Sequence, residues 1–194
     1  MQINKRKIGE TEINPVGLGC MNMTPSYGPG LKRDDALNFL SKAIDLGYDF
    51  FDTATIYGLG ENEKLVGEAL KSNRDSFLIA SKCVLGFADG KRFLDGRPST
   101  IKAACEASLE RLQTEVIDLY YMHLPDPKVP IEESIGALAD LKQEGKIRML
   151  GLSEMSAETL RRAHSEHPIS AMQSEYSLMT RNPELAVLEA CKEL

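Results

Sequence analysis

Residues 36 to 54 read ALNFLSKAIDLGYDFFDTA and contain one predicted helix followed by one predicted strand. Gly47 stands where helices commonly end in a left-handed conformation. The short apolar run from residue 49 to residue 54 is typical of a strand. The helix is predicted because its apolar residues recur at helical spacing: Ala36, Phe39, Leu40, Ala43 and Ile44.

The same alternation continues on both sides of this stretch. A second amphipathic helix follows from residue 101 to residue 112, and a third from residue 131 is stopped by Gly145. Ser156 is the expected N-cap of a fourth helix, and Asn182-Pro183 is a strong start signal for a fifth. The six predicted strands are Val16–Met21, Asp49–Ala54, Phe77–Val84, Val116–Leu124, Ile147–Ser153 and Ala171–Tyr176.

Strict alternation of strands and helices predicts parallel pairing and an α/β fold. Either an open doubly wound sheet or a closed (β/α)8 TIM barrel has this pattern. The open sheet gains little support, because the turn after the first strand, residues 17–22, lacks a third glycine. Residues 3–7 and 12–15 flank Gly9 and predict a small N-terminal β-hairpin. Residues 24–30, 86–98 and 125–130 are predicted as loops.

Composition excludes several classes of protein. The chain has 194 residues, 42% of them hydrophobic, and a net charge of −6, so no nucleic-acid partner and no anionic membrane surface is expected. The four cysteines form no CxxC pair, and no metal site or disulfide framework is expected. The first residues lack the apolar core of a secretory signal, which predicts a cytoplasmic protein.

Polar residues follow the predicted strands where a barrel would bring the strand ends together. Asp52 ends the second strand, with Tyr57 in the loop after it, and Lys82 lies near the end of the third. His123 lies near the end of the fourth strand, and the fifth and sixth carry Ser153 and Gln173. The carboxyl ends of barrel strands meet at one mouth, so these side chains should share a cavity.

This set suits proton transfer to a carbonyl oxygen. Tyr57 would be the acid, and a nearby ammonium from Lys82 is expected to lower the phenol pKa. Asp52 would hold that ammonium, and His123 would hydrogen-bond the same oxygen. Nothing in the set supplies a hydride, so reduction requires a bound cofactor.

These motifs resemble the aldo-keto reductase superfamily along the whole chain. The matching segments are residues 49–54 with Tyr57-Gly58, 60–63, 80–82, 117–123, 145–148, 151–153 and 173–177. Residues 151–164 resemble the branch with plant auxin-induced-like, perakine and pyridoxal reductases.

The resemblance implies a (β/α)8 barrel that reduces an aldehyde or ketone with NADPH. The family's catalytic tetrad falls on Asp52, Tyr57, Lys82 and His123, and its carboxamide-binding residues fall on Ser153 and Gln173. Gly19, Cys20 and Met21 would lie beside the nicotinamide ribose, with Asp52 also near the cofactor. The family's usual asparagine after the serine is Glu154 here, and its phosphate-binding segments have no equivalents in this chain. The partner is a small carbonyl compound; neither the substrate nor the oligomeric state is specified.

Three other functions remain open. Lys82 at a barrel mouth is compatible with a Schiff-base aldolase. Channel β-subunits that resemble this family keep the barrel and the cofactor, so a nucleotide-binding regulatory subunit is a further alternative. The chain could also be an inactive fragment.

The spacing of the strands bears on this last alternative. From residue 16 to residue 171, five repeats give about 31 residues each, and eight such repeats need the ~250 residues typical of the barrel. The sequence therefore predicts a single barrel domain, residues 1–194, with about six of eight units and incomplete at its C-terminus.

Overall fold

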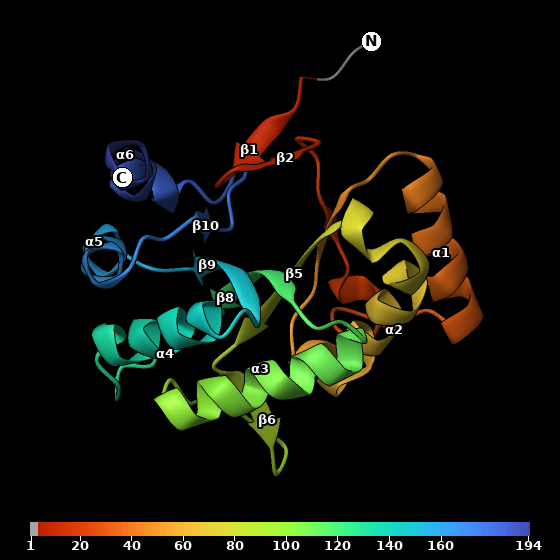
Figure 1. The fold of residues 1–194 in the computed structure, drawn as a ribbon, viewed down its shortest axis with the longest axis horizontal. Helices are drawn as coiled ribbons and strands as arrows, with labels where there is room; N and C mark the ends of the chain where they lie inside the picture. The colour runs from red at the N-terminus through yellow and green to blue at the C-terminus, as the bar shows by residue number, and fades with distance from the viewer. Residues whose placement is uncertain (1–3) are drawn as a thin grey trace.

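The computed structural model describes residues 4–194, and the sheet at its centre is parallel throughout (Figure 1). The spatial order of its strands is β10-β9-β8-β5-β4-β3. These strands are β3 (Leu18–Gly19), β4 (Phe50–Asp52), β5 (Leu78–Cys83), β8 (Ile117–Met122), β9 (Ile147–Ser153) and β10 (Ala171–Gln173). All six lie within the predicted strands, which the structure shortens at one end or both, except β9.

Six α-helices lie outside the sheet in the described residues (Figure 1). They are α1 (Arg33–Asp45), α2 (Glu61–Leu70), α3 (Pro98–Leu112), α4 (Ile131–Gln143), α5 (Ala157–Glu166) and α6 (Val187–Glu193). The predicted faces of α3 and α4 are buried completely, and Ser156 caps α5 by accepting a hydrogen bond from the Thr159 N–H at 3.1 Å. In α1, Phe39 of the predicted face is exposed. No helix in this part of the chain is long and apolar enough to cross a membrane.

The sheet curls into a half-barrel. The side-chain amide of Gln173 on β10 donates a hydrogen bond to Asp52 Oδ2 on β4 at 2.9 Å, although three strands separate β10 from β4 in the sheet. A flat sheet would hold these residues more than 15 Å apart, since neighbouring strands are ~4.8 Å apart. The curled α/β fold agrees with the predicted architecture at this level.

The alternation of side chains along each strand separates two apolar clusters. The outer faces of the strands pack against the helices, with Phe51, Ile79 and Leu150 fully buried. The concave side holds Leu78, Ala80, Leu119, Tyr121 and Met149. Because the period of a strand is two residues, Asp52 and Lys82 share this inner face.

A short hairpin covers the amino-terminal end of the concave side. It consists of β1 (Arg6–Ile8) and β2 (Thr11–Ile13), which confirms the predicted hairpin, whose residue Ile3 lies outside the described residues. Ile8 and Ile13 pack on the inner cluster, and the Asn14 N–H donates to Asp49 Oδ1 at 2.9 Å. This end is therefore closed, and the opposite end carries the polar residues.

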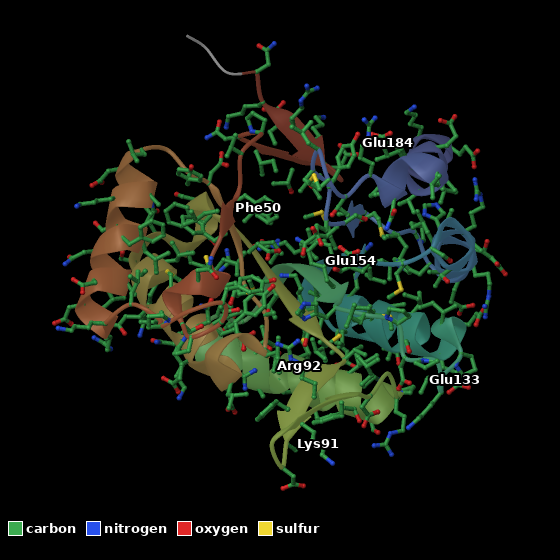
Figure 2. The ribbon with its side chains drawn as sticks, turned by 180° about the vertical axis from the view of Figure 1, so that it is seen from behind. Phe50, Lys91, Arg92, Glu133, Glu154 and Glu184 are labelled. Atoms are coloured by element: carbon green, nitrogen blue, oxygen red, sulfur yellow. The ribbon has the colours of Figure 1, made fainter. Side chains whose placement is uncertain are left out.

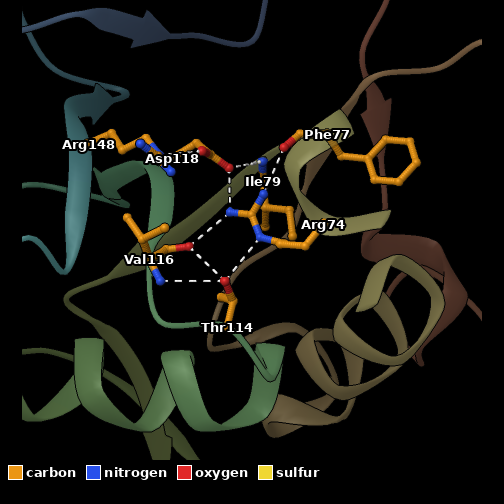
Figure 3. A network of polar contacts seen from close by, with 7 residues as sticks. All are labelled: Arg74, Phe77, Ile79, Thr114, Val116, Asp118 and Arg148. Carbon is orange, nitrogen blue, oxygen red and sulfur yellow. Dashed lines mark hydrogen bonds and ion pairs between the residues drawn. The ribbon is translucent and has the colours of Figure 1, made fainter. Parts of the chain in front are cut away.

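Hydrogen bonds from Arg74 connect the strands at the same closed end (Figure 3). Its guanidinium donates to the carbonyls of Phe77 at 2.8 Å and Val116 at 2.9 Å, and to Asp118 Oδ2 at 2.5 Å. Asp118 also accepts from the Ile79 N–H at 2.9 Å and from Arg148 Nε at 3.0 Å. One buried carboxylate thus links β5, β8 and β9.

Three predicted features are wrong in detail. The predicted loop 86–98 contains an antiparallel hairpin, β6 (Leu85–Ala88) with β7 (Lys91–Leu94), because its alternating residues pair across the turn at residues 89–90. The helix expected from Pro183 is split into a 3-10 turn (Asn182–Leu185) and α6, since Ala186 has non-helical backbone angles. Met21 lies in a 3-10 turn (Met21–Met23) after β3, where a strand was predicted.

Candidate active site

The candidate active site lies at the open, carboxyl end of the half-barrel. Lys82 on β5 is almost fully buried, with 1% of its side chain exposed. Its ammonium forms an ion pair with Asp52 and donates to the Thr53 carbonyl at 2.9 Å and to Tyr57 Oη at 3.3 Å. These three acceptors match the three donors of an ammonium group, so Lys82 is fixed in place.

Tyr57 is held in this position by a turn of unusual backbone conformation. It begins a 3-10 turn (Tyr57–Gly60) in which Gly58 and Gly60 have φ angles of 56° and 94°. A Cβ atom on Gly58 would lie 2.7 Å from the Thr24 side chain. Glycine at position 58 therefore allows the Tyr57 loop to approach the loop that follows β3.

The ring of His123 completes the group. It lies edge-on to the Tyr57 ring, with centroids 5.8 Å apart and an interplanar angle of 85°. The backbone N–H of His123 donates to the Cys83 carbonyl at 3.1 Å, which places this residue beside the end of β5. Its Nδ1 atom is buried and has no hydrogen-bond partner within residues 4–194.

Burial and charge decide how these groups are protonated. Burial raises the pKa of Tyr57, and the opposing effect of the Lys82 charge is smaller. The lowered phenol pKa expected from the sequence is therefore wrong, because loss of hydration penalises the phenolate more than the ammonium favours it. Burial and the charges of Lys82 and Arg92 lower the pKa of His123 to about 4. Both rings are neutral at pH 7.

The residues expected to contact a cofactor gather around this group. Gln173 and Ser153 are register partners on β10 and β9, and the Gln173 amide reaches Asp52. Within residues 4–194 the Ser153 hydroxyl has no hydrogen-bond partner. Gly19 pairs with Asp52 in the sheet, and a Cβ atom there would meet nothing within 4 Å.

Cys20 and Met21 differ from Gly19 in their surroundings. The Cys20 thiol is fully buried in the outer cluster and contacts the Leu18 carbonyl at 3.6 Å, and burial raises its pKa. The side chain of Cys20 therefore points away from the open end, leaving only its backbone beside Asp52, where the Cys20 N–H donates to the Asp52 carbonyl at 2.9 Å. Met21 follows in the 3-10 turn and is half-buried.

A family model described as "Aldo/keto reductase family" matches residues 15–194. The chain belongs to the aldo/keto reductase family.

Similar proteins agree with this assignment. The "Probable aldo-keto reductase 1" of Glycine max is 44% identical over 199 residues, covering 100% of this chain and 57% of that protein. The glycerol dehydrogenase of Gluconobacter oxydans is 33% identical, with a TM-score of 0.92 over 100% of this chain and 61% of that one. An aldo/keto reductase of Klebsiella pneumoniae, solved with NADP and acetate, is 28% identical, with a TM-score of 0.83 over 100% of this chain and 65% of that one. The chain thus spans little more than half the length of the curated relative.

Within this aldo/keto reductase chain, two buried residues of the site's surroundings were missed from the sequence. Tyr121 is the register partner of Lys82, and its ring lies 6.0 Å from Lys82 Nζ. Asn62 is fully buried; its amide donates to the Cys20 carbonyl at 2.8 Å, and its carbonyl accepts from the Thr53 hydroxyl at 2.7 Å. The register of β5 with β8 would have indicated Tyr121. Asn62 lies in the matching segment 60–63, but the sequence did not indicate its buried contacts, because its partners are 42 and 9 residues away.

Glu154, where the family usually has asparagine, also has a defined place (Figure 2). Its φ angle is 54°, a left-handed conformation that asparagine adopts more readily than glutamate. Its N–H donates to the Gln173 carbonyl at 2.9 Å, and its carboxylate accepts from the Glu175 N–H at 2.5 Å. The carboxylate therefore joins the end of β9 to the segment after β10.

Proposed function

We propose that this protein reduces an aldehyde or ketone to an alcohol, using NADPH, with Tyr57 as the proton donor. The observation that carries the proposal is the contact of the buried Lys82 ammonium with both Asp52 and Tyr57, beside the neutral ring of His123. Membership of the aldo/keto reductase family supports carbonyl chemistry in general. NADPH, when bound, supplies the hydride.

The residues divide the remaining work in the following way. Tyr57 keeps its proton at neutral pH because burial raises its pKa, so it can donate that proton to a carbonyl oxygen. Lys82 stabilises the phenolate that remains, and Asp52 balances the charge of Lys82 between turnovers. The neutral ring of His123 has one N–H to donate to the same oxygen as negative charge develops there.

The fit of a nicotinamide group is supported by the surroundings of Ser153 and Gln173. The Ser153 hydroxyl and the Gln173 side-chain carbonyl have no partners within residues 4–194, and the two residues are adjacent in register. A carboxamide needs one acceptor and one donor, which this pair offers. Gly19 and the backbone of Cys20 and Met21 would line the ribose side, next to Asp52.

We also propose that residues 1–194 form part of a single (β/α)8 barrel domain, of which the half-barrel contributes six units. The open edges of β3 and β10 support this, since a closed barrel leaves no unpaired strand edge. NADP in the Klebsiella pneumoniae relative supports the choice of cofactor.

Two alternatives gain less support. A Schiff-base aldolase needs a free amine, whereas all three donors of Lys82 are engaged. A regulatory subunit is not favoured by the relatives, whose names describe reductases and a dehydrogenase.

Substitution of Tyr57 by Phe tests the proposal. NADPH oxidation in the presence of a panel of aldehydes is expected to fall by at least about 100-fold, because the proton donor is removed while the ring remains. Tyr48→Phe is the control, since Tyr48 precedes β4, at the end of that strand opposite to Tyr57. Equal turnover by Tyr57→Phe and the wild-type chain would exclude Tyr57 as the acid.

A further inference from the structure

The β6–β7 hairpin rises directly from the end of the strand that carries Lys82. Only Val84 separates β5 from β6, and the return strand β7 is tied back where the Asp95 N–H donates to the Val84 carbonyl at 3.0 Å. The backbone of His123 is bonded to Cys83 at the same place. The base of the hairpin therefore adjoins the candidate active site.

Register assigns the two cations of this hairpin to different faces. Arg92 is opposite Phe87, and Lys91 is opposite Ala88, so the side chains of Arg92 and Lys91 alternate in direction. Figure 2 labels both residues on the hairpin. Phe87 is 44% exposed and shares its face with Arg92, because directly opposed residues lie on the same side of a two-stranded sheet.

Arg92 differs from most of the other arginines in its partners. Eight arginines of the described residues form an ion pair with a carboxylate within 4.0 Å. Arg92 and Arg6 form none within residues 4–194, and of these two only Arg92 lies on the hairpin that follows β5. Its guanidinium is thus available to an external anion.

The charge of Arg92 reaches the reacting groups. Lys82 and Asp52 neutralise each other, and the rings of Tyr57 and His123 are neutral, so these four residues carry no net charge at pH 7. The positive charge of Arg92 is felt at His123, where it contributes to the lowered pKa. Arg92 is the smallest of the three causes, and its hairpin joins the end of β5 at Val84, next to the Cys83 carbonyl that accepts from the His123 N–H.

We propose that Arg92 binds a carboxylate on the substrate, with Phe87 contacting the apolar part, so that the preferred substrates are carbonyl compounds carrying an acidic group. This inference rests on the proposed function and names the substrate class for the same site. A guanidinium offers two parallel N–H donors to a carboxylate, which fixes both the position and the orientation of the bound molecule.

The test compares two aldehydes that differ in charge, 4-carboxybenzaldehyde and its neutral methyl ester. The ratio of their kcat/KM values is expected to favour the acid by about tenfold in the wild-type chain. Arg92→Gln should bring the ratio close to one. Lys91→Gln makes the same change of charge on the other face of the hairpin and should keep the wild-type ratio. An unchanged ratio in Arg92→Gln, or an equal fall in Lys91→Gln, would overturn the proposal.

A second measurement needs no turnover and separates this proposal from the proposed function. The chain has three histidines, whose ring signals can be followed by NMR as benzoate is added. A shift of the His123 signals that is lost in Arg92→Gln and kept in Lys91→Gln supports the anion site even if neither aldehyde is reduced. Absence of any shift in the wild-type chain contradicts it.

Discussion

At the scale of single residues, Lys82 influences the protonation of both neighbouring rings. Its charge opposes the effect of burial on Tyr57 and adds to the effect of burial on His123. The ammonium lowers both pKa values, because it favours a phenolate and disfavours an imidazolium, whereas burial raises the pKa of Tyr57 and lowers that of His123. Burial therefore keeps the proton on Tyr57, and burial and Lys82 together keep His123 uncharged.

Replacing Lys82 by Met should raise the pKa of His123 above its value of about 4, because a neighbouring positive charge is removed. An NMR titration of the histidine rings measures this directly. Lys102→Met is the matched control, since Lys102 is on α3 and paired with Asp140, and it should leave His123 unchanged. A pKa of His123 that is the same in Lys82→Met and in the wild-type chain would show that the charge of Lys82 does not contribute to the lowering.

The sequence predicted which of these residues lie together, but it did not predict their protonation. Asp52, Lys82 and Gln173 lie at strand ends with the same side-chain parity as the inner cluster, which a sequence pattern can reveal. The direction of the Tyr57 pKa depends on how completely neighbouring chain segments remove water from its ring. That depends on tertiary packing, which no local pattern contains.

At the scale of elements, α2 and α3 approach closely at Gly67. A Cβ atom on Gly67 would lie 2.4 Å from the backbone carbonyl oxygen of Leu112 at the end of α3. Helical glycine is ordinarily less stable than alanine by roughly 0.5–1 kcal/mol. At position 67 glycine is nevertheless the residue that fits, because a larger side chain would force α2 and α3 apart.

Gly67→Ala should therefore lower the free energy of unfolding by about 1–3 kcal/mol, measured by urea denaturation. Gly136→Ala in α4 provides the matched control, because a Cβ atom there meets nothing within 4 Å. That substitution should stabilise the chain by about 0.4–1 kcal/mol. The opposite signs are the result to look for, and two stabilising substitutions would mean that α2 and α3 can separate at no cost.

Elements with a strong apolar period could be predicted from sequence, and elements held by distant contacts could not. The faces of α3 and α4 follow from spacing alone. In α2, which was not predicted, the buried set includes the polar Asn62 and Glu63, whose partners come from other elements, and only Val66 and Leu70 as large apolar residues. The β6–β7 hairpin was missed because its residues are mostly exposed and Gly86, Asp89 and Gly90 are typical of a loop.

At the scale of the whole molecule, the half-barrel has one closed and one open end. The hairpin of β1 and β2 and the Arg74–Asp118 contacts close the amino-terminal end. Polar residues collect at the open end, where the buried Nδ1 atom of His123 has no hydrogen-bond partner among the described residues. Such a ring reports on folding, because its environment exists only when the strands are assembled.

The pKa of His123 links this arrangement to the stability of the chain. An unfolded histidine has a pKa near 6.5, whereas the folded ring has a pKa of about 4. Between these values the unfolded chain binds a proton that the folded chain does not, so this residue favours unfolding as the pH falls. Its effect is absent above about pH 6.5 and complete below about pH 4.

His123→Gln removes this titration while keeping a polar side chain of similar size. The quantity to compare is the unfolding free energy of the wild-type chain minus that of the variant. This difference should decrease by roughly 2 kcal/mol as the pH falls from 7 to 4. The expected decrease takes into account that the ring is partly exposed to solvent. Taking the difference cancels the carboxylates that titrate over the same range, because both chains share them. Urea denaturation at several pH values measures it. A difference that stays constant would mean that His123 is hydrated in the folded chain, and the neutral ring proposed at the open end would then be wrong.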